Sequence, residues 1–469
     1  MYDPLTEASF KRTVLFVAAA ASFLGPFMIS TVNIALPAIG QYFGADAVTL
    51  GWVATSYMLA TVVALVPVGK AADIAGRRKV FALGAAIVAL FNILVLFSIN
   101  LSFLIICRVF QGIGGAMIVT TSVAILASVF PPGERGKAMG INTAATYLGL
   151  SSGPFFGGIL VQNFGWKSIF VTAGALGLFV LYTILRHIKT EWVASKEKPF
   201  DILGSFLYVI FLLSFMYGVF LIPQIKSLYF ILTGMALSIV FFRYQWVASN
   251  PVFNVRLFVD NRSFAFSNMA ALINYAATAS VAFLLSLYLQ YVKNMSPQSA
   301  GLVLVIQPAI QAVFSPYAGR MSDKIEPRFI ASAGMALTAL GLFLLAILKI
   351  DTSMSYLAMA LCCLGFGFAL FSSPNVNAIM SSVSNEYYGI ASSSLATMRL
   401  LGQTMSLALA TAIFSIMLGK EEVSTANIGI FLKSVNLSFV ISTITCIIGI
   451  YFSYARGEIL SHKASNNSD

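Results

Sequence analysis

Charged side chains and cysteines are scarce in this sequence. Asp, Glu, Lys and Arg make up 10% of its 469 residues, whereas 59% of the residues are hydrophobic. A soluble domain of this composition would have too little polar surface to cover its apolar residues. Histidine occurs twice, and the cysteines lie inside apolar runs without the spacing of metal ligands. We therefore expect no metal site, and we interpret the four cysteines as small core residues, namely Cys107, Cys362, Cys363 and Cys446.

Motifs of enzymatic chemistry are absent as well. The sequence has no Gly-x-x-x-x-Gly-Lys phosphate-binding loop and no recognisable pair of a nucleophile and a base. We therefore expect no enzyme, no cofactor and no direct coupling to ATP hydrolysis.

Long apolar runs, separated by short charged loops, fill most of the chain. Each run has 18 residues or more, and a helix of about 20 residues crosses the hydrocarbon core of a bilayer. This pattern predicts an all-α membrane protein. We place about fourteen spans, at 13–36, 48–69, 79–98, 102–130, 138–161, 166–187, 202–222, 227–248, 264–292, 299–319, 329–349, 355–380, 389–418 and 432–455.

Lys and Arg are unevenly divided between the two sides of the membrane. With a cytoplasmic amino terminus, 20 of the 28 basic residues lie in inner segments, six in outer segments and two within spans. This asymmetry follows the positive-inside rule and predicts a multi-pass protein of the inner cell membrane with both termini in the cytoplasm. The net charge of +11 therefore reflects topology, and we expect no nucleic-acid partner. An alternative with twelve spans, in which 202–222 and 227–248 do not cross, keeps this orientation, but the length of these two runs argues against it.

Two loops of the chain resemble each other. The first reads GKAADIAGRRKV from Gly69 to Val80, and the second reads GRMSDKIEPRFI from Gly319 to Ile330. Four pairs of matching positions are 250 residues apart: Gly69 and Gly319, Lys70 and Arg320, Asp73 and Asp323, Arg78 and Arg328. Duplicated halves around a central cavity are a common plan of transporters. We therefore divide the chain into an amino-terminal six-helix bundle at 1–190, two additional spanning helices with linkers at 191–262, and a carboxy-terminal six-helix bundle with a short cytoplasmic tail at 263–469.

The first of these loops resembles the signature loop of the major facilitator superfamily, Gly-x-x-x-Asp-x-x-Gly-Arg-Arg. Two further motifs are similar to those of this family: LIICRVFQGIGGA at 104–116 in the fourth span and the antiporter motif GLSSGPFFGG at 149–158 in the fifth. Three segments resemble its fourteen-span drug:proton antiporter branch: FDILGSF at 200–206, PVFNVRLF at 251–258 and RLLGQ at 399–403. The resemblance covers nearly the whole chain. It implies the major facilitator fold, with two six-helix bundles plus two extra helices, and export of drugs in exchange for protons.

The first span departs from the pattern of that branch. There an Asp usually precedes a Thr-Val-x-Asn-x-Ala-Leu-Pro stretch, whereas here the stretch reads FMISTVNIALP and Met28 stands in the place of the Asp. Proton coupling at this position, and a preference for cationic drugs, therefore do not follow from the resemblance.

The resemblance assigns a gating role to the paired loops. A carboxylate at the end of a span, such as Asp73, can contact the positive end of a neighbouring helix and an arginine, either Arg77 or Arg78. Such a contact can latch the two halves together on the cytoplasmic side; the alternative is a loop whose basic residues only determine topology. The gating residues that we predict are Gly69, Asp73, Gly76, Arg77, Arg78, Gly319, Asp323 and Arg328.

Small residues line one face of the fifth span. Gly149, Gly153 and Gly157 recur every four residues and form a smooth stripe. Pro154 removes a backbone donor and bends the helix. We predict close packing between the halves and a gating role for this stripe together with Gly158; ordinary packing of small residues is the alternative.

Two arginines fall inside spans. Arg108 lies about six residues into the fourth span, roughly 9 Å deep, and Arg399 lies ten residues into the thirteenth, roughly 15 Å deep. A charge at such depth needs a wet cavity or a partner, which makes it a candidate for function; an arginine bonded to backbone carbonyls for structure is the alternative. Adding the polar residues on the same faces or at mid-depth, we predict a substrate or coupling cavity formed by Arg108, Gln111, Arg399, Gln403, Asn33, Tyr147, Asn274, Tyr275, Gln307 and Gln311.

Acidic residues are missing from the middle of the spans, because all 17 Asp and Glu fall in loops, tails or span ends. A cavity with arginines and without carboxylates prefers neutral or anionic, lipophilic compounds to organic cations. The leading hypothesis is a monomeric secondary active exporter of multidrug type that moves small lipophilic organic compounds by alternating access, with proton antiport implied by the resemblance. The alternatives are a proton-independent permease or uptake carrier for an organic anion, and a non-transporting membrane sensor or assembly protein on the same scaffold.

Cysteine labelling tests the count and the orientation of the spans. In a background without the native cysteines, a membrane-impermeant thiol reagent added to intact cells should modify Lys293→Cys and Lys420→Cys but not Lys196→Cys, because only the first two lie in outer loops. Modification of Lys226→Cys from the cytoplasmic side alone would contradict the fourteen-span assignment at its weakest point.

Overall fold

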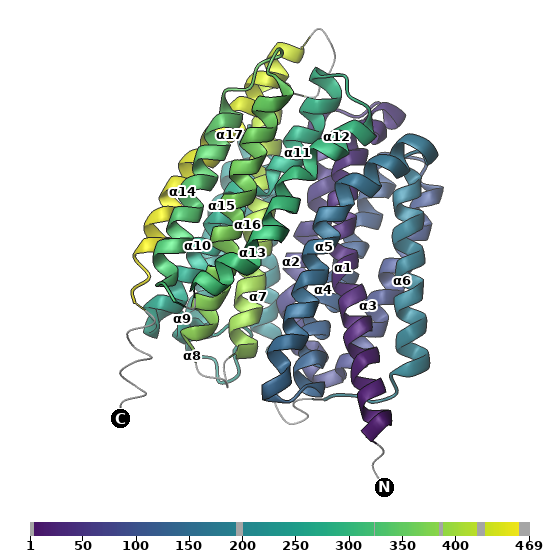
Figure 1. The fold of residues 1–469 in the computed structure, drawn as a ribbon, viewed down its shortest axis with the longest axis vertical. Helices are drawn as coiled ribbons and strands as arrows, with labels where there is room; N and C mark the ends of the chain where they lie inside the picture. The colour runs from purple at the N-terminus through teal and green to yellow at the C-terminus, as the bar shows by residue number, and fades with distance from the viewer. Residues whose placement is uncertain (1–3, 194–199, 323, 384–387, 420–426, 459–469) are drawn as a thin grey trace.

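The computed structural model describes residues 4–193, 200–322, 324–383, 388–419 and 427–458, and over these ranges it consists of helices joined by loops and turns, without a strand (Figure 1). Fourteen helical stretches within these ranges are long and apolar enough to cross a membrane. They agree with the predicted spans to within a few residues at most of their ends, although α1 (Pro4–Phe43) continues well beyond its predicted end at residue 36. The predicted all-α fold with fourteen spans is confirmed.

The first six spans pack against one another and are called here the first bundle. α1 packs mainly on the fifth span, and the second and third spans both pack on the fourth. The remaining members of the first bundle are α2 (Ala47–Ala75), α3 (Arg77–Leu94) with the 3-10 turn η1 (Val95–Phe97), α4 (Leu101–Val129), α5 (Pro132–Phe164) and α6 (Lys167–His187).

The second bundle is built from the last six spans. A short helix, α9 (Val255–Asp260), precedes it. Its members are α10 (Arg262–Thr278), α11 (Ser280–Leu287) with the π-helical turn η2 (Tyr288–Val292), α12 (Pro297–Leu304), α13 (Ile306–Ser322), α14 (Pro327–Ala346), α15 (Met354–Ser381), α16 (Tyr388–Met417) and α17 (Ile428–Tyr454).

Two spans of the second bundle are interrupted along their length, which the sequence patterns did not predict. α12 gives way to α13 at Val305, where Pro308 has no N–H to donate to the carbonyl of Leu304. α10 gives way to α11 at Ala279, where the N–H of Ser280 donates to the Ser406 hydroxyl of α16 at 3.0 Å instead of bonding within its own helix.

Side chains that cap the first turn determine where several helices begin. Each accepts a hydrogen bond from a backbone N–H that would otherwise lack a partner in its helix. These residues are Asp46, Asn100, Asp201, Asn254, Asn261, Ser296 and Ser353.

The start of α1 and the end of α17 lie at one end of the molecule, called here the terminal end, and the opposite end is called the distal end (Figure 1). The bundles meet at the distal end, where α5 contacts α12. A Cβ on Gly301 would lie 2.1 Å from the carbonyl oxygen of Pro154, and a Cβ on Gly158 would lie 2.6 Å from that of Pro297. Only glycine permits such a close approach of two backbones, so these positions close the distal end.

The hairpin of α7 (Ile202–Phe220) and α8 (Lys226–Val247) lies beside the two bundles and touches both of them. The Tyr208 hydroxyl of α7 donates to the Val62 carbonyl of α2 at 3.1 Å. Leu400 of α16 joins the buried cluster around Tyr208, and the rings of Trp52 and Phe220 are 4.0 Å apart. α8 faces outward along most of its length, and only 17% of the residues in its apolar 18-residue stretch are buried.

The base of this hairpin is held by one carboxylate. Asp201 accepts hydrogen bonds from the N–H of Gly204 at 2.8 Å, from the Tyr244 hydroxyl at 3.0 Å and from the Gln245 amide at 2.8 Å. Gln245 in turn accepts from the N–H of Phe253 at 3.0 Å. The cap of α7 therefore also ties the start of α7 to the end of α8.

We expect Asp201→Ala to destabilise the purified protein by about 2 kcal/mol, because it leaves the amide of buried Gln245 without its acceptor. Thermal unfolding in detergent checks this through a lower Tm. Asp260→Ala, which removes an exposed carboxylate at the end of α9, is the matched control and should leave Tm unchanged. An equal Tm for both variants would show that the Asp201 bonds do not hold the hairpin.

Candidate functional site

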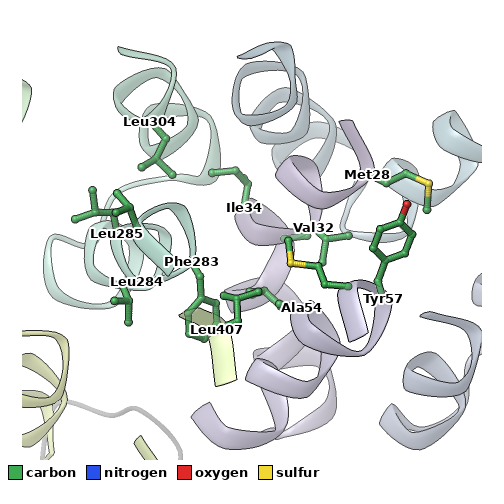
Figure 2. Close-up of a cluster of buried hydrophobic side chains, with 14 of the residues drawn as sticks. Met28, Val32, Ile34, Ala54, Tyr57, Phe283, Leu284, Leu285, Leu304 and Leu407 are labelled. Carbon is green, nitrogen blue, oxygen red and sulfur yellow. The ribbon is translucent and has the colours of Figure 1, made fainter. Parts of the chain in front are cut away.

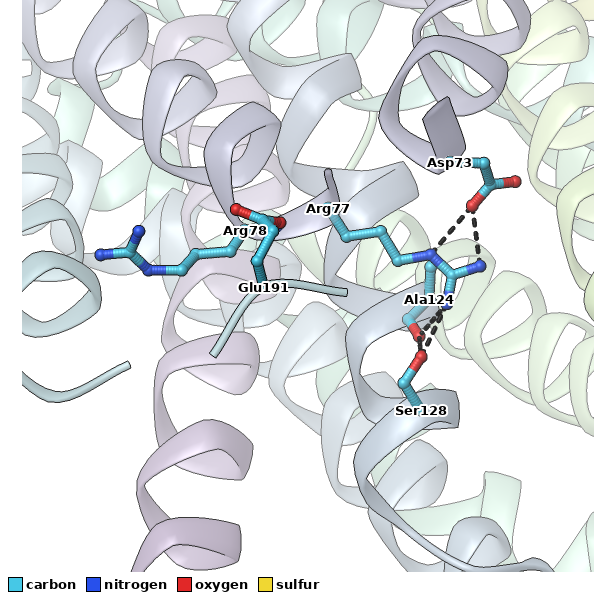
Figure 3. Close-up of polar contacts among 6 residues, drawn as sticks. All are labelled: Asp73, Arg77, Arg78, Ala124, Ser128 and Glu191. Atoms are coloured by element: carbon cyan, nitrogen blue, oxygen red, sulfur yellow. Dashed lines mark hydrogen bonds and ion pairs between the residues drawn. The ribbon is translucent and has the colours of Figure 1, made fainter. Parts of the chain in front are cut away.

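Two residues of the first loop, Asp73 and Arg77, form an ion pair at the end of α2 (Figure 3). The Arg77 guanidinium donates through Nε and Nη2 to Asp73 Oδ1 at 2.9 and 2.7 Å. Its Nη1 donates to the Ala124 carbonyl at 3.0 Å and to the Ser128 hydroxyl at 2.6 Å, both in α4. One arginine therefore joins the end of α2 to the end of α4.

The next arginine joins the same loop to the segment that follows α6. The backbone N–H of Arg78 donates to Glu191 Oε1 at 2.8 Å, and its guanidinium donates to the Ile188 carbonyl. Gly76 has a φ of 111°, and a Cβ there would lie 2.6 Å from the Glu191 carboxylate. This explains the glycine of the motif, because a side chain would be strained and would displace Glu191. The sequence patterns did not single out Glu191, which lies 113 residues from Arg78.

The latch that we expected between the two halves stays a prediction. The described contacts of Asp73, Arg77 and Arg78 are made within the first bundle and with the segment that follows its sixth span. The carboxylate of Asp73 is neutralised by Arg77 one turn away, so it holds its own bundle together in this state.

The loop of the second bundle repeats part of this arrangement. Arg328 Nη2 donates to Glu458 Oε1 at 2.7 Å, so the arginine is again held by an acid that follows the sixth span of its own bundle. Nearby in the chain, burial lowers the pKa of Arg456 to about 9. A Cβ on Gly319 would lie 2.7 Å from the Ser373 hydroxyl of α15. Asp323, the counterpart of Asp73, lies outside the described residues.

Arg108 is buried inside the first bundle. Its Nε donates to the Val53 carbonyl at 3.2 Å, its Nη1 donates to Gln111 Oε1 at 3.1 Å, and its guanidinium lies 4.6 Å from the centre of the Tyr57 ring. Gln111 donates to the Phe91 carbonyl at 3.2 Å. With 1% of Arg108 exposed, this geometry supports the structural alternative for this arginine.

Met28, which stands where the antiporter acid is usually found, lies beside Tyr57 (Figure 2). Its sulfur accepts a weak hydrogen bond from the Asn92 amide at 3.7 Å, and that amide also donates to the Val88 carbonyl at 2.7 Å. The position is buried and carries no titratable group, so it has no proton to exchange.

The glycine stripe of α5 faces α1 of the same bundle. Cβ atoms on Gly149, Gly153 and Gly157 would lie 2.3 Å from the Phe23 carbonyl oxygen, 2.4 Å from Ser30 and 3.0 Å from Thr31. The contact between the bundles that we expected at this stripe is made instead by the neighbouring Pro154 and Gly158. Those two residues point toward α12 because they lie on the adjoining face of α5.

A polar and aromatic cluster lies between the bundles, at mid-depth. The Tyr147 hydroxyl of α5 is 2.6 Å from the Ser372 hydroxyl of α15. Tyr275 of α10 shares polar contacts with both of these residues and lies within electrostatic reach of Arg399 on α16. The Phe368 ring lies edge-on to Tyr275, 5.5 Å between centroids. The predicted residues Tyr147, Tyr275 and Arg399 are therefore brought together.

Arg399 is half-buried and, among the described residues, has neither a hydrogen bond nor an ion pair. Gln403, one turn further along α16, is also half-buried, as is Gln307. Gln311 is buried, and its amide nitrogen has no partner within the described part of the chain. Asn274 is fully buried in the second bundle with both side-chain polar atoms unpaired. Asn33 of α1 is 5% exposed and lies near the contact with α11.

Comparison with known proteins decides the family. The family model described as Major Facilitator Superfamily matches residues 18–258 and 268–467. The chain belongs to the major facilitator superfamily. It is a multi-pass membrane transporter and not an enzyme.

Two relatives of this chain are named for different functions. The riboflavin transporter RibZ of Clostridioides difficile (strain 630) is 31% identical over 94% of this chain and 96% of that protein. The multidrug resistance protein Stp of Mycobacterium tuberculosis is 30% identical over 85% of this chain and 75% of that protein.

Solved structures of the superfamily share the fold at low sequence identity. A bacterial homologue of the human lysosomal transporter Spinster, in an inward-facing and unoccupied conformation, matches 98% of this chain and 99% of its own with a TM-score of 0.68 and 16% identity. A D-xylose–proton symporter matches 94% of this chain and 97% of its own with a TM-score of 0.67 and 14% identity.

We expect Asp73→Asn to lower transport several-fold while the amount of folded protein hardly changes, because a partly exposed ion pair contributes only about 1 kcal/mol to stability. Transport in vesicles, normalised to monodisperse protein from the same membranes, separates the two effects. Asp46→Asn is the matched control, since Asp46 is an acidic cap at the other end of α2. If Asp73→Asn and the parent transport equally well, the loop has no gating role and its basic residues only determine topology.

Proposed function

We propose that this transporter is a secondary carrier of small, lipophilic, neutral or anionic organic compounds, and that Arg399 and the tyrosines around it bind the substrate between the two bundles. The observation that carries the proposal is the half-buried guanidinium of Arg399, which has no hydrogen-bond or ion-pair partner among the described residues.

Arginine stays protonated in proteins, so Arg399 cannot escape the electrostatic penalty of its depth by losing its charge. Water, a carbonyl oxygen or an anionic group must therefore face it. Arg108 meets the same requirement with the Val53 carbonyl and Gln111, inside one bundle. Arg399 lies instead within electrostatic reach of Tyr275, which contacts Tyr147 of the other bundle, where a carried compound would pass.

The neighbours of Arg399 suit an aromatic compound with hydrogen-bonding groups at its edge. Tyr147, Tyr275 and Phe368 offer ring surfaces, and the two tyrosines and Ser372 offer hydroxyls. Riboflavin, the compound named for one relative, combines an aromatic ring system with carbonyl groups and is therefore the first substrate to test. The multidrug resistance relative supports a broader range of lipophilic compounds.

The proposed cycle is alternating access between the two sides of the membrane. The distal end is closed by the contact of α5 with α12. The excess of basic residues in the loops of the terminal end supports a cytoplasmic location for that end. We therefore assign the structure to the state that is shut toward the outside, and we place the protein in the cell membrane.

Export in exchange for protons and proton-independent permeation remain distinct candidates. Antiport is supported by the multidrug resistance relative, whereas Met28 in place of the usual acid supports a carrier that does not use protons at that position. Accumulation of riboflavin in inverted vesicles with and without an imposed pH gradient decides between them, because only an antiporter depends on the gradient.

We expect Arg399→Gln to lower transport of an organic anion by about tenfold or more, since a hydrogen bond to a charged group is worth about 1.5–3 kcal/mol, and to lower transport of a neutral drug less. Arg399→Lys should fold and transport weakly, because a point charge replaces a planar fork. Arg243→Gln, at an exposed arginine of α8, is the matched control.

Two results would contradict this assignment. Loss of folded protein in both Arg399 variants, with no substrate affected more than another, would make the arginine structural. Normal transport of every compound by well-folded Arg399→Gln would remove it from the binding site.

A further inference from the structure

Pro37 leaves one backbone carbonyl of α1 without a partner in its own helix. In an α-helix each carbonyl accepts from the N–H four residues later, and proline has no N–H. Pro37 lies inside α1, so the carbonyl of Asn33 lacks its donor. Asn33 is 5% exposed, and a buried carbonyl of this kind needs a donor from elsewhere.

The missing donor comes from the other bundle. The hydroxyl of Ser286, which is fully buried in α11, donates to the Asn33 carbonyl at 2.6 Å. Gln290, one turn further and within η2, donates to the Ile34 carbonyl at 3.1 Å and to the Ser286 hydroxyl at 3.1 Å. Two adjacent carbonyls of the first bundle are therefore bonded by two neighbouring side chains of the second.

Pro154, a second proline of the first bundle, shows how a donor from the same bundle differs from a donor of the other bundle. Pro154 frees the carbonyl of Leu150 in α5, and that carbonyl accepts from the Ser30 hydroxyl at 3.1 Å. Ser30 belongs to α1, in the same bundle, so this bond moves with the bundle as a whole. The bond from Ser286 crosses between the bundles and has to break when they separate.

The residues that flank Asn33 and Ser286 in the chain belong to a buried apolar cluster, part of which is shown in Figure 2. Val32 and Ile34 of α1 and Ala54 of α2 belong to the same buried cluster as Phe283 and Leu285 of α11. The cluster keeps water away from the carbonyls while the distal end is closed, so the donors of the second bundle are needed there. Water can replace them once the distal end opens.

The closed contact between the bundles at the distal end is called here the distal gate. We propose that Ser286 and Gln290 form a polar lock that holds the distal gate shut, and that Pro37 creates the acceptor of this lock. The lock makes the closed gate depend on a bond that only the apposed second bundle can supply. The inference rests on alternating access as part of the proposed function, but it does not depend on the substrate.

The test measures how often the distal gate opens. Ala54, 4% exposed and within the apolar cluster, is replaced by cysteine in a background without the native cysteines. A membrane-impermeant thiol reagent is then applied to intact cells and to inverted vesicles. The rate of modification is taken from the preparation in which the distal end faces the reagent. No transported compound is needed, so a failure to find the substrate does not affect the result.

Ser286→Ala should raise the rate of modification roughly five- to tenfold, the factor expected for the loss of one net hydrogen bond. Pro37→Ala should raise it similarly, because the new N–H satisfies the Asn33 carbonyl within α1 and makes Ser286 dispensable. The double variant Ser286→Ala, Pro37→Ala should be no faster than the faster single variant, because both changes remove the same bond.

Two variants serve as controls. Ser434→Ala removes a fully buried hydroxyl that bonds only within α17, to the Ile430 carbonyl at 2.9 Å. Ser30→Ala removes the donor to the carbonyl that Pro154 frees within the first bundle. Neither should change the rate of modification, although Ser30→Ala is expected to lower Tm.

The proposal of a lock would be overturned if Ser286→Ala and Pro37→Ala both fold and are modified as slowly as the parent. Additive effects in the double variant would also overturn it. If Ser286→Ala fails to fold, Pro37→Ala carries the test alone, since alanine suits a helix interior better than proline. Faster modification together with no transport of any tested compound would support the lock and count against the proposed function.

Discussion

The hydrocarbon of a bilayer offers no hydrogen-bond partners, so the backbone groups of every span need partners within the protein. This constraint explains the helical fold and also the places where the helices are irregular. The carbonyls that Pro154 and Pro37 leave free are each taken by a serine of another helix, Ser30 and Ser286. Such bonds join helices to one another, so the irregular positions of the spans are also positions at which the tertiary structure is held.

The same constraint applies to charge, and the two arginines that lie deep within spans meet it differently. Arg108 finds the Val53 carbonyl, Gln111 and the face of Tyr57 inside one bundle, which makes it part of a rigid core. Arg399 lies within electrostatic reach of Tyr275, which contacts Tyr147 of the other bundle, and has no hydrogen-bond or ion-pair partner among the described residues. Its position between the bundles, more than its charge, supports a role in binding.

Each bundle is tied together at the terminal end by its own loop. Arg78 in the first bundle and Arg328 in the second both contact an acid that follows the sixth span of the same bundle, Glu191 and Glu458. These contacts link the third span of each bundle to the segment that follows its sixth span. Two units that are internally tied, and that meet through close glycine contacts at the distal end, are suited to move against each other as rigid bodies.

The sequence by itself determined the number and the place of the spans and the family, because the bilayer sets the length of an apolar helix and the family motifs are local. It also pointed to Tyr147, Tyr275 and Arg399 through their depth along the spans. It did not reveal Glu191, Glu458 or Ser286, whose partners lie more than 100 residues away. Tertiary structure alone decided that the glycine stripe of α5 faces α1, that Arg108 is enclosed and that Arg399 is left open. The physical reason is that depth in the membrane follows from position along a helix, whereas the neighbour that a face meets depends on how all fourteen spans pack.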